Sequence, residues 1–288
     1  MKSRKPSSEA IKQRYSCRSY QRIAIEEATR KELELFINGN TKCPFNTDIR
    51  FKLVSAAEGD SQALRGLGTY GFIKNPAGFV VGAMKKSAND CLDFGYLMEK
   101  NVLFLTELGL GSCWLGASFK KSRFAERFGV ESDEEIPAII TFGYISDEKT
   151  YRDSVMHFAA GSAKRKPNSE LFFKRNGLPL SEHESGKYVK ALEMVRLAPS
   201  AANFQPWKMI KEENGSDTYH LYLKRSVGYA SVNKIIDRAD LQKIDMGIAM
   251  CHFELGAREA GLNGGWKILD KVARPQNVKF EYIATWMG

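Results

Sequence analysis

The chain has 288 residues, of which 43% are hydrophobic and 27% are charged, a composition typical of a soluble globular protein with one large domain or two ordinary ones. No apolar run approaches the roughly 20 residues of a membrane helix, and the basic N-terminus lacks the apolar part of a secretion signal, so we expect a cytoplasmic protein without a membrane partner. Five scattered cysteines without a Cys-x-x-Cys pair, and four histidines without close spacing, argue against disulfides and a metal site. The formal net charge is +9, but Lys and Arg are spread along the chain without a nucleic-acid-binding motif, so we expect no nucleic-acid partner.

The first distinctive element is the basic segment RYSCRSY, residues 14–20. Its residues Arg14, Ser16 and Arg18 alternate, so in an extended segment their side chains point to one side. Two guanidiniums and a hydroxyl at one place suit a phosphate group, which Arg binds through charge-assisted hydrogen bonds. The alternative is a solvated basic turn before a helix, and the segment alone leaves both interpretations open.

The glycine-rich segment GLGTYG, residues 66–71, matches the Gly-x-Gly-x-x-Gly pattern of dinucleotide-binding proteins. That pattern requires a strand before it and a helix after it. Here FIKNPAGFVVGA follows, which contains Pro76 and Gly78 and is typical of a strand. We therefore predict a loop in which the glycines allow close backbone packing, and not a dinucleotide site.

Two segments of the chain repeat each other without a gap: residues 93–114, DFGYLMEKNVLFLTELGLGSCW, and residues 245–266, DMGIAMCHFELGAREAGLNGGW. The matches include Asp93 with Asp245, Gly95 with Gly247, Glu107 with Glu259 and Trp114 with Trp266. Each segment predicts a long, largely apolar helix that ends at a glycine and is followed by a tryptophan.

The similarity extends in both directions from these helices. Residues 33–54 resemble residues 192–210 as a helix, a turn and a strand, and IITFG from Ile139 resembles IATWMG from Ile283 as a final strand. We therefore predict two copies of one α+β unit, with a first half at 1–158, a polar linker with a basic motif at 159–170 and a second half at 171–288. Because each copy alone would leave an apolar helix uncovered, we expect the two long helices to pack together in one core.

The two copies differ where a ligand could bind. The second copy carries LAPSAANFQPW, residues 197–207, whose small residues would admit a flat molecule and whose Ser200, Asn203 and Gln205 offer polar groups. The first copy has NTKCPFN there. A helix end with proline breakers and a core Trp is the alternative. The segment LGLGSCWLGAS, residues 108–118, is either a glycine cap with buried Trp and Cys or an exposed backbone ledge whose N–H groups face a ligand.

Together, RYSCRSY, PSAANFQPW and GLGSCWLGAS resemble three elements of the FMN-dependent nitroreductase family, and KRKP, residues 164–167, resembles its basic motif near the C-terminal end. The resemblance covers nearly the whole chain. It implies the α+β, FMN-dependent nitroreductase-like fold. Members of the family are usually homodimers with two flavins at the interface, so the tandem implies an intramolecular pseudo-dimer that functions as a monomer. Because each copy has kept only half of the flavin-binding elements, we expect one flavin per chain.

The resemblance also implies roles for particular residues. Arg14, Ser16 and Arg18 would bind the FMN phosphate with Lys164 and Lys166, and the second copy would contribute Pro199, Ser200, Ala201 and Asn203. The edge of the flavin ring would be lined by Trp114, Leu115 and Gly116, with the Gly116 N–H near the reactive N5. Many members have Glu in place of Leu115, so their substrate preference is not carried over. Gln62 and Arg65 are candidates for contacts to the flavin ring.

The implied activity is that of an FMN-dependent oxidoreductase. NAD(P)H, the co-substrate, would reduce the flavin, which would then reduce a nitroaromatic, a quinone or a similar small acceptor. No protein nucleophile or dedicated acid is needed, because the cofactor carries the chemistry. A non-catalytic flavin-binding protein, a sensor or an FMN carrier on the same fold, is the alternative.

Overall fold

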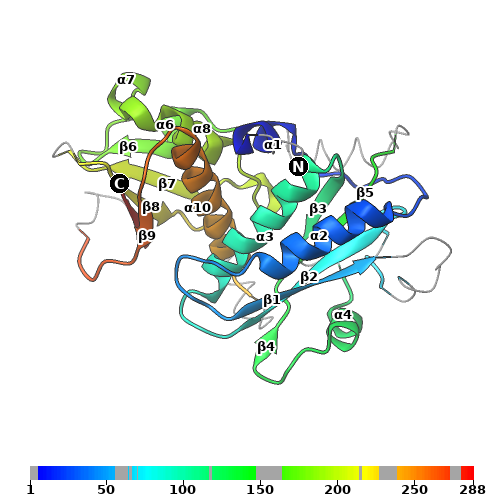
Figure 1. Ribbon diagram of the computed structural model, residues 1–288. Coiled ribbons are helices and arrows are strands. Elements are labelled where there is room, and N and C mark those ends of the chain that lie inside the picture. The colour runs from blue at the N-terminus through cyan, green and yellow to red at the C-terminus, as the bar shows by residue number, and fades with distance from the viewer. Residues whose placement is uncertain are drawn as a thin grey trace. The chain divides into compact units, whose positions relative to one another are not determined.

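The computed structural model describes residues 6–55, 64, 67–69, 71–116, 119–146, 164–213, 216–226, 239–272 and 280–288. The chain divides into two compact units (Figure 1), of which the first contains residues 12–90 and 97–160 and the second contains residues 6–11, 91–96 and 161–288. The second unit therefore includes two short segments from the first half of the sequence. Among the described residues, no helix has the length and apolarity needed to cross a membrane.

The first unit is built on an antiparallel sheet with the strand order β1-β2-β5-β3, to which the short β4 adds by pairing with β2. Its strands are β1 (Ile49–Ser55), β2 (Gly78–Lys85), β3 (Gly111–Leu115), β4 (Glu134–Glu135) and β5 (Ile139–Gly143). Its helices are α2 (Glu27–Gly39), α4 (Lys121–Phe128) and most of α3 (Asp90–Glu107). Buried side chains from these strands and from α4, including Phe79, Phe124 and Ile139, form one apolar cluster that fixes the sheet.

The second unit has a sheet with the order β6-β7-β8-β10-β9, in which β6 runs parallel to β7 and the other pairs are antiparallel. Its strands are β6 (Phe172–Lys174), β7 (Trp207–Lys211), β8 (Thr218–Leu223), β9 (Gly265–Lys267) and β10 (Glu281–Met287). The main helices are α8 (Val189–Leu197) and α10 (Leu241–Glu259). The short ones are α1 (Ser7–Gln13, of which residues 7–11 belong to this unit), α6 (Asn168–Leu171), α7 (Glu182–Ser185), η1 (Gly186–Tyr188) and η2 (Ala201–Asn203).

The two units share one topology. In each, a helix is followed by two antiparallel strands, a long helix and two more strands: α2, β1, β2, α3, β3 and β5 in one, and α8, β7, β8, α10, β9 and β10 in the other. The equivalent strands occur in the same order within each sheet, and β6 is an additional strand in the second. The predicted duplication of one α+β unit is therefore visible in the strand order.

Both long helices end in the same way. Gly109 and Gly261 follow α3 and α10 with φ of 78° and 75°, in the left-handed region that glycine adopts without steric cost. In each case the next residue donates its N–H back to the last turn, Leu110 to the Leu105 carbonyl at 2.9 Å and Leu262 to the Ala257 carbonyl at 2.9 Å. The predicted stop at a glycine is confirmed. The tryptophans that follow, Trp114 and Trp266, lie in the strands β3 and β9.

The predicted packing of the two long helices is confirmed within the second unit, which contains residues 91–96 of α3 together with α10. A Cβ added at Gly95 would overlap the carbonyl oxygen of Ile244, and one added at Gly247 would overlap the carbonyl oxygen of Leu92. Glycine therefore allows the two backbones to touch. Aromatic rings extend this core, since Phe253 on α10 packs edge-on against both Trp266 and Trp286.

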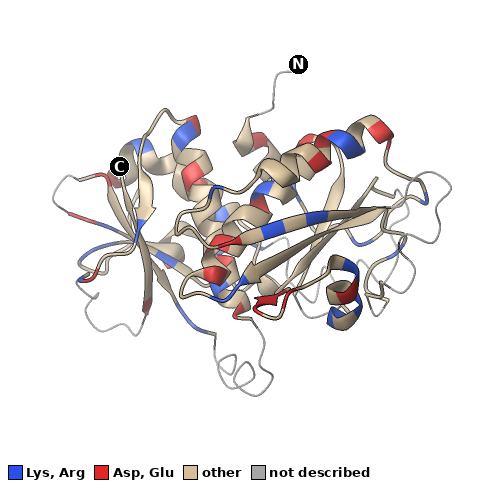
Figure 2. Ribbon diagram, turned by 60° about the horizontal axis from the view of Figure 1, so that its bottom comes forward, with Lys and Arg blue, Asp and Glu red and all other residues tan. Residues whose placement is uncertain are grey.

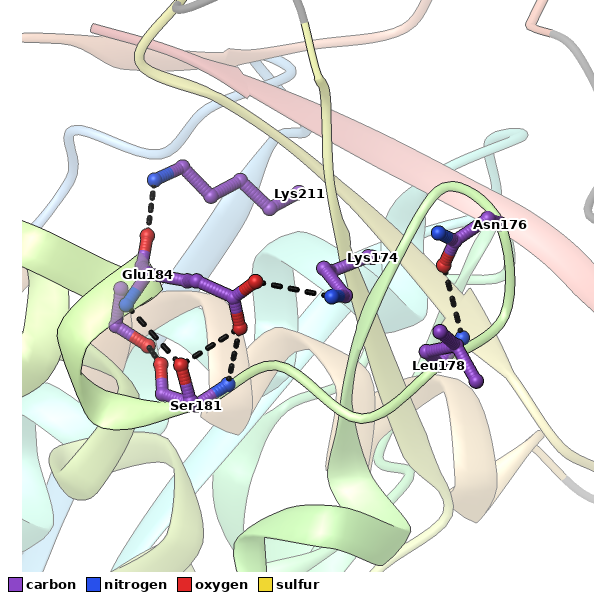
Figure 3. Close-up of polar contacts among 7 residues, drawn as sticks. Lys174, Asn176, Leu178, Ser181, Glu184 and Lys211 are labelled. Atoms are coloured by element: carbon purple, nitrogen blue, oxygen red, sulfur yellow. Dashed lines mark hydrogen bonds and ion pairs between the residues drawn. The ribbon is translucent and has the colours of Figure 1, made fainter.

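Short polar elements complete the second unit. Figure 3 shows that Ser181 caps α7 in a capping box: its hydroxyl accepts the Glu184 N–H at 3.2 Å, and the Glu184 carboxylate accepts the Ser181 N–H at 3.0 Å. Lys174 of β6 donates to the same carboxylate at 2.9 Å, and Lys211 of β7 donates to the Glu184 carbonyl. These bonds attach α7 to the two neighbouring strands.

Positively and negatively charged residues are interspersed along the described elements (Figure 2). On α2, for example, Arg30 lies between Glu27 and Glu34 and forms ion pairs with both, at 2.8 and 3.2 Å. Such pairing on one exposed helix face is typical of a solvated surface.

Candidate functional site

The segment RYSCRSY lies along β3 in the first unit. Ser16 forms a parallel bridge with Ser112, and the Cys17 N–H donates to the Ser112 carbonyl at 2.8 Å. The Lys74 N–H donates to the Arg18 carbonyl at 2.8 Å. The buried Tyr20 ends the segment and donates its hydroxyl to the Cys17 carbonyl at 2.8 Å. The backbone that carries the two arginines is therefore anchored, and the segment is not a solvated turn.

The guanidiniums of Arg14 and Arg18 each contain a buried nitrogen without an acceptor. Arg14 Nε and Arg18 Nη1 have no hydrogen-bond partner among the residues that the structure describes. Burial lowers the pKa of Arg14, against the opposing effect of Glu99. Both arginines also lie near the Cys113 thiol. Burial raises the pKa of this thiol to about 11, against the opposing effect of the charges of Arg18 and Arg14. Two arginines beside one thiol, with unused donors, form an arrangement suited to an anion.

The segment after α3 is a strand. Of the two interpretations of residues 108–118, the glycine cap with a buried Cys agrees with it, since Gly109 ends α3 and Cys113 is buried. β3 pairs with β5 from Gly111 to Leu115, which uses the backbone groups on one edge of the strand, and on the other edge the Ser112 carbonyl accepts the Cys17 N–H. The Leu115 side chain is 6% exposed and belongs to the apolar cluster of the first unit. It faces the core, so only the backbone of Leu115 remains for a ligand. Gly116 follows the strand and is partly exposed.

The Trp114 side chain on β3 makes a hydrogen bond to a buried carboxylate. Its indole Nε1–H donates to Glu99 Oε2 at 2.9 Å, and Glu99 is fully buried on α3. Glu99 also raises the pKa of Arg14. One buried carboxylate therefore orients the Trp114 ring and lies beside one of the two arginines. Sequence reasoning did not find Glu99, whose signal was only an acidic residue inside an apolar helix.

The loop 199–205 of the second unit has a strained backbone. Ala202, Asn203 and Gln205 have φ of 47°, 55° and 48°, a region that non-glycine residues rarely adopt. Such residues cost about 1–3 kcal/mol each and occur where the surrounding structure imposes them, often at ligand sites. Within the loop, the Gln205 N–H donates to Ser200 Oγ at 2.9 Å and the Asn203 N–H to the Ser200 carbonyl at 3.0 Å. The polar side chains thus shape the loop itself.

The segment KRKP lies on this loop, and both belong to the second unit. Asn203 Nδ2 donates to the Lys164 carbonyl at 2.8 Å, and the Lys166 N–H donates to Gln205 Oε1 at 2.8 Å. Lys166 Nζ donates to the Phe204 carbonyl at 2.6 Å, so its ammonium serves the loop, and burial lowers its pKa. The Lys164 side chain is exposed. The end of the predicted linker is therefore structured.

Two further residues of this site were not found from the sequence. Arg165 donates to Asn203 Oδ1 at 2.7 Å and to the Leu197 carbonyl at 3.2 Å, joining the loop to the end of α8. Asp245, 3% exposed on α10, accepts the Ala201 N–H on Oδ1 at 2.9 Å. Two features of the sequence could have indicated these residues: Arg165 lies inside KRKP, and Asp245 matches Asp93 in the repeat.

The predicted residues therefore fall into two groups. The first unit brings together Arg14, Ser16, Arg18, Trp114, Leu115 and Gly116, and the second unit brings together Lys164, Lys166, Pro199, Ser200, Ala201 and Asn203. Gln62 and Arg65, with part of the segment 66–71, lie outside the described residues. Within the described part of the chain, no group of three or more His, Cys, Asp or Glu residues could hold a metal ion.

Comparison with solved structures defines the class of this fold. A nitroreductase-type structure from Thermotoga maritima covers 100% of this chain and 95% of its own, with a TM-score of 0.62 and 21% identity. A nitroreductase family protein from Clostridium difficile covers 57% of this chain, with a TM-score of 0.41 and 22% identity over 94% of its own length. A nitroreductase with bound FMN from Desulfitobacterium hafniense covers 50% of this chain and 92% of its own, with a TM-score of 0.39 and 16% identity. The likeness to the Thermotoga maritima structure over the whole chain shows that the fold is that of the nitroreductases.

The family follows from the sequence itself. The family described as "Putative TM nitroreductase" matches residues 7–257, and the chain belongs to this family. No match was found among the curated proteins. The expected resemblance to the nitroreductase family and the expected fold class are confirmed.

Proposed function

We propose that this protein is an FMN-dependent oxidoreductase that takes electrons from NAD(P)H and reduces a small acceptor such as a quinone or a nitroaromatic compound. Its membership of the nitroreductase family and its fold support the class of reaction. Two structural neighbours are an oxidoreductase containing FMN and a nitroreductase with bound FMN. When bound, FMN supplies hydride acceptance and onward electron transfer.

The observation that carries the proposal is the pair of buried donors without acceptors, Arg14 Nε and Arg18 Nη1. Leaving a buried cationic donor unsatisfied is costly, so such a pair fits a dianionic phosphate that provides the acceptors. The Ser16 hydroxyl belongs to the same extended segment. These three residues would hold the phosphate of FMN.

The remaining residues would orient the flavin and exclude water. The fully buried Glu99 fixes the Trp114 ring through its indole N–H. The loop 199–205 is held in one conformation by Ser200, Arg165 and Lys166, so it would present a rigid surface of small residues. Because Leu115 faces the core, the edge of the ring would meet the backbone of residues 115 and 116. The chain would hold one flavin and act as a monomer.

The test begins with the absorption spectrum of the purified protein, which should show a bound flavin that mass spectrometry identifies as FMN. Anaerobic addition of NADH or NADPH should bleach the flavin band, and a quinone or nitroaromatic acceptor should restore it. The double variant Arg14→Ala/Arg18→Ala should be purified without flavin. A protein that binds FMN but is not bleached by either nucleotide is a flavin carrier or sensor. A protein that does not bind FMN contradicts the proposal.

A further inference from the structure

Asp245 is a buried carboxyl group without an ion-pair partner among the described residues. It lies in the first two turns of α10, is 3% exposed and accepts the Ala201 N–H on Oδ1 at 2.9 Å. Its other oxygen, Oδ2, is buried and has no hydrogen-bond partner in the described part of the chain. The nearest described cation in sequence, Lys243, pairs with Glu281 at 3.9 Å, and Arg225 is paired with Asp240 and Glu281.

The bond to Ala201 reaches the start of the strained turn. Ser200 is extended, and the Ala201 N–H is the first donor of η2. The Ser200 hydroxyl, which could cap this turn, instead accepts the Gln205 N–H from the far end of the loop. The N–H of Ala201 therefore depends on Asp245, while Ala202, Asn203 and Gln205 remain in the left-handed region.

We propose that Asp245 is the positioning residue of the loop 199–205 and thereby sets the geometry with which Pro199, Ser200 and Ala201 meet the flavin. The inference rests on the proposed FMN function. Asp245 would not touch the cofactor or the reacting atoms. It would act through the Ala201 N–H.

The surroundings of Asp245 favour a neutral carboxylic acid. Burial raises its pKa well above the usual range, nearby Asp240 raises it further, and the Ala201 N–H lowers it. A protonated Asp245 can accept from Ala201 with one oxygen and donate from the other, as an asparagine side chain does. A charged Asp245 would supply no donor.

The experiment compares Asp245→Asn and Asp245→Ala with Gln242→Ala, an equally buried truncation on the same helix. Gln242 donates to Ser226 at 2.8 Å and has no described contact with the loop. We would measure FMN affinity by fluorescence titration of the apoprotein, scaled to the folded fraction, and hydrogen exchange of the Ala201 amide without FMN. Loss of one buried hydrogen bond predicts about tenfold weaker FMN binding and faster exchange in Asp245→Ala. Asp245→Asn should remain within about threefold of the wild type.

A second measurement follows thermal stability from pH 5 to pH 9. A carboxyl whose folded pKa is raised contributes stability that is complete below its unfolded pKa and lost as the pH rises through the folded value. The advantage of Asp245→Asn over the wild type should therefore grow with pH. Wild-type affinity in Asp245→Ala, or equal losses in Asp245→Ala and Gln242→Ala, would overturn the inference. Wild-type protein that fails to bind FMN would instead contradict the proposed function.

Discussion

Gly247 on α10 lies directly against the carbonyl oxygen of Leu92 on α3, within the second unit. The reciprocal contact joins Gly95 to the carbonyl oxygen of Ile244. Leu92 and Gly95 match Ile244 and Gly247 in the sequence repeat, so each contact is the counterpart of the other. A symmetric dimer makes such reciprocal contacts between two copies of one surface. Here both helices belong to one chain, and the two contacts follow the sequence match between them.

We expect Gly247→Ala and Gly95→Ala to destabilise the protein by about 1–3 kcal/mol each or more, because the added methyl group must displace a helix backbone. Urea denaturation would measure the loss. Gly39→Ala is the control, since nothing lies within 4 Å of a Cβ at this end of α2. A Gly247→Ala protein as stable as the wild type would show that the helices do not touch.

Arg14→Ala and Arg18→Ala should weaken FMN binding by about ten- to a hundredfold each, since a charge-assisted contact contributes roughly 1.5–3 kcal/mol. Isothermal titration of the apoproteins with FMN would show the change. Arg123→Ala, which removes an exposed arginine of α4, should bind FMN as the wild type does. Full affinity in both site variants would mean that the phosphate binds elsewhere.

The chain should bind one FMN and not two. Only the first half carries the Arg-x-Ser-x-Arg element, and only the second half carries the Pro-Ser-x-x-Asn loop. Heat denaturation followed by absorbance would give the ratio of released flavin to protein. A ratio near two would contradict the proposed single site.

Lys208 should make stability depend on pH above neutrality. It lies on β7, is 6% exposed and donates to the Glu170 carbonyl. Burial lowers its pKa to about 8, and the neighbouring Lys166 and Lys224 lower it further, against the effect of Glu170. Between pH 8 and the unfolded value of about 10.5, the unfolded chain binds more protons at this group, so its contribution to stability rises with pH.

The Lys208→Met variant should remove this contribution. Thermal denaturation at intervals from pH 7 to pH 10 should give a smaller rise, or a steeper fall, in stability than in the wild type. Lys52→Met, in which an exposed lysine of β1 is removed, should keep the wild-type profile. Identical profiles for all three proteins would show that Lys208 titrates normally.

The amino-acid sequence determined the features that depend on local pattern and on repetition. The match between residues 93–114 and 245–266 predicted two long helices with glycine ends, and Gly109 and Gly261 adopt the left-handed backbone that ends them. Alternation in RYSCRSY placed Arg14, Ser16 and Arg18 on one side if the segment is extended, and the bridge between Ser16 and Ser112 shows that the segment runs along a strand. These properties follow from backbone geometry over a few residues, so they can be read before the fold is known.

Only the tertiary structure decided which side chains remain available for a ligand. Leu115 lies in a motif that suggests flavin contact, yet it faces the apolar cluster, and the Lys166 ammonium bonds to the loop carbonyls. In the sequence, Asp245 is one acidic residue in an apolar helix. In the structure its carboxyl group accepts the N–H of Ala201, which is 44 residues away along the chain. Burial and hydrogen bonding between distant segments arise when the sheet and helices close around a core, and no periodicity along the chain records them.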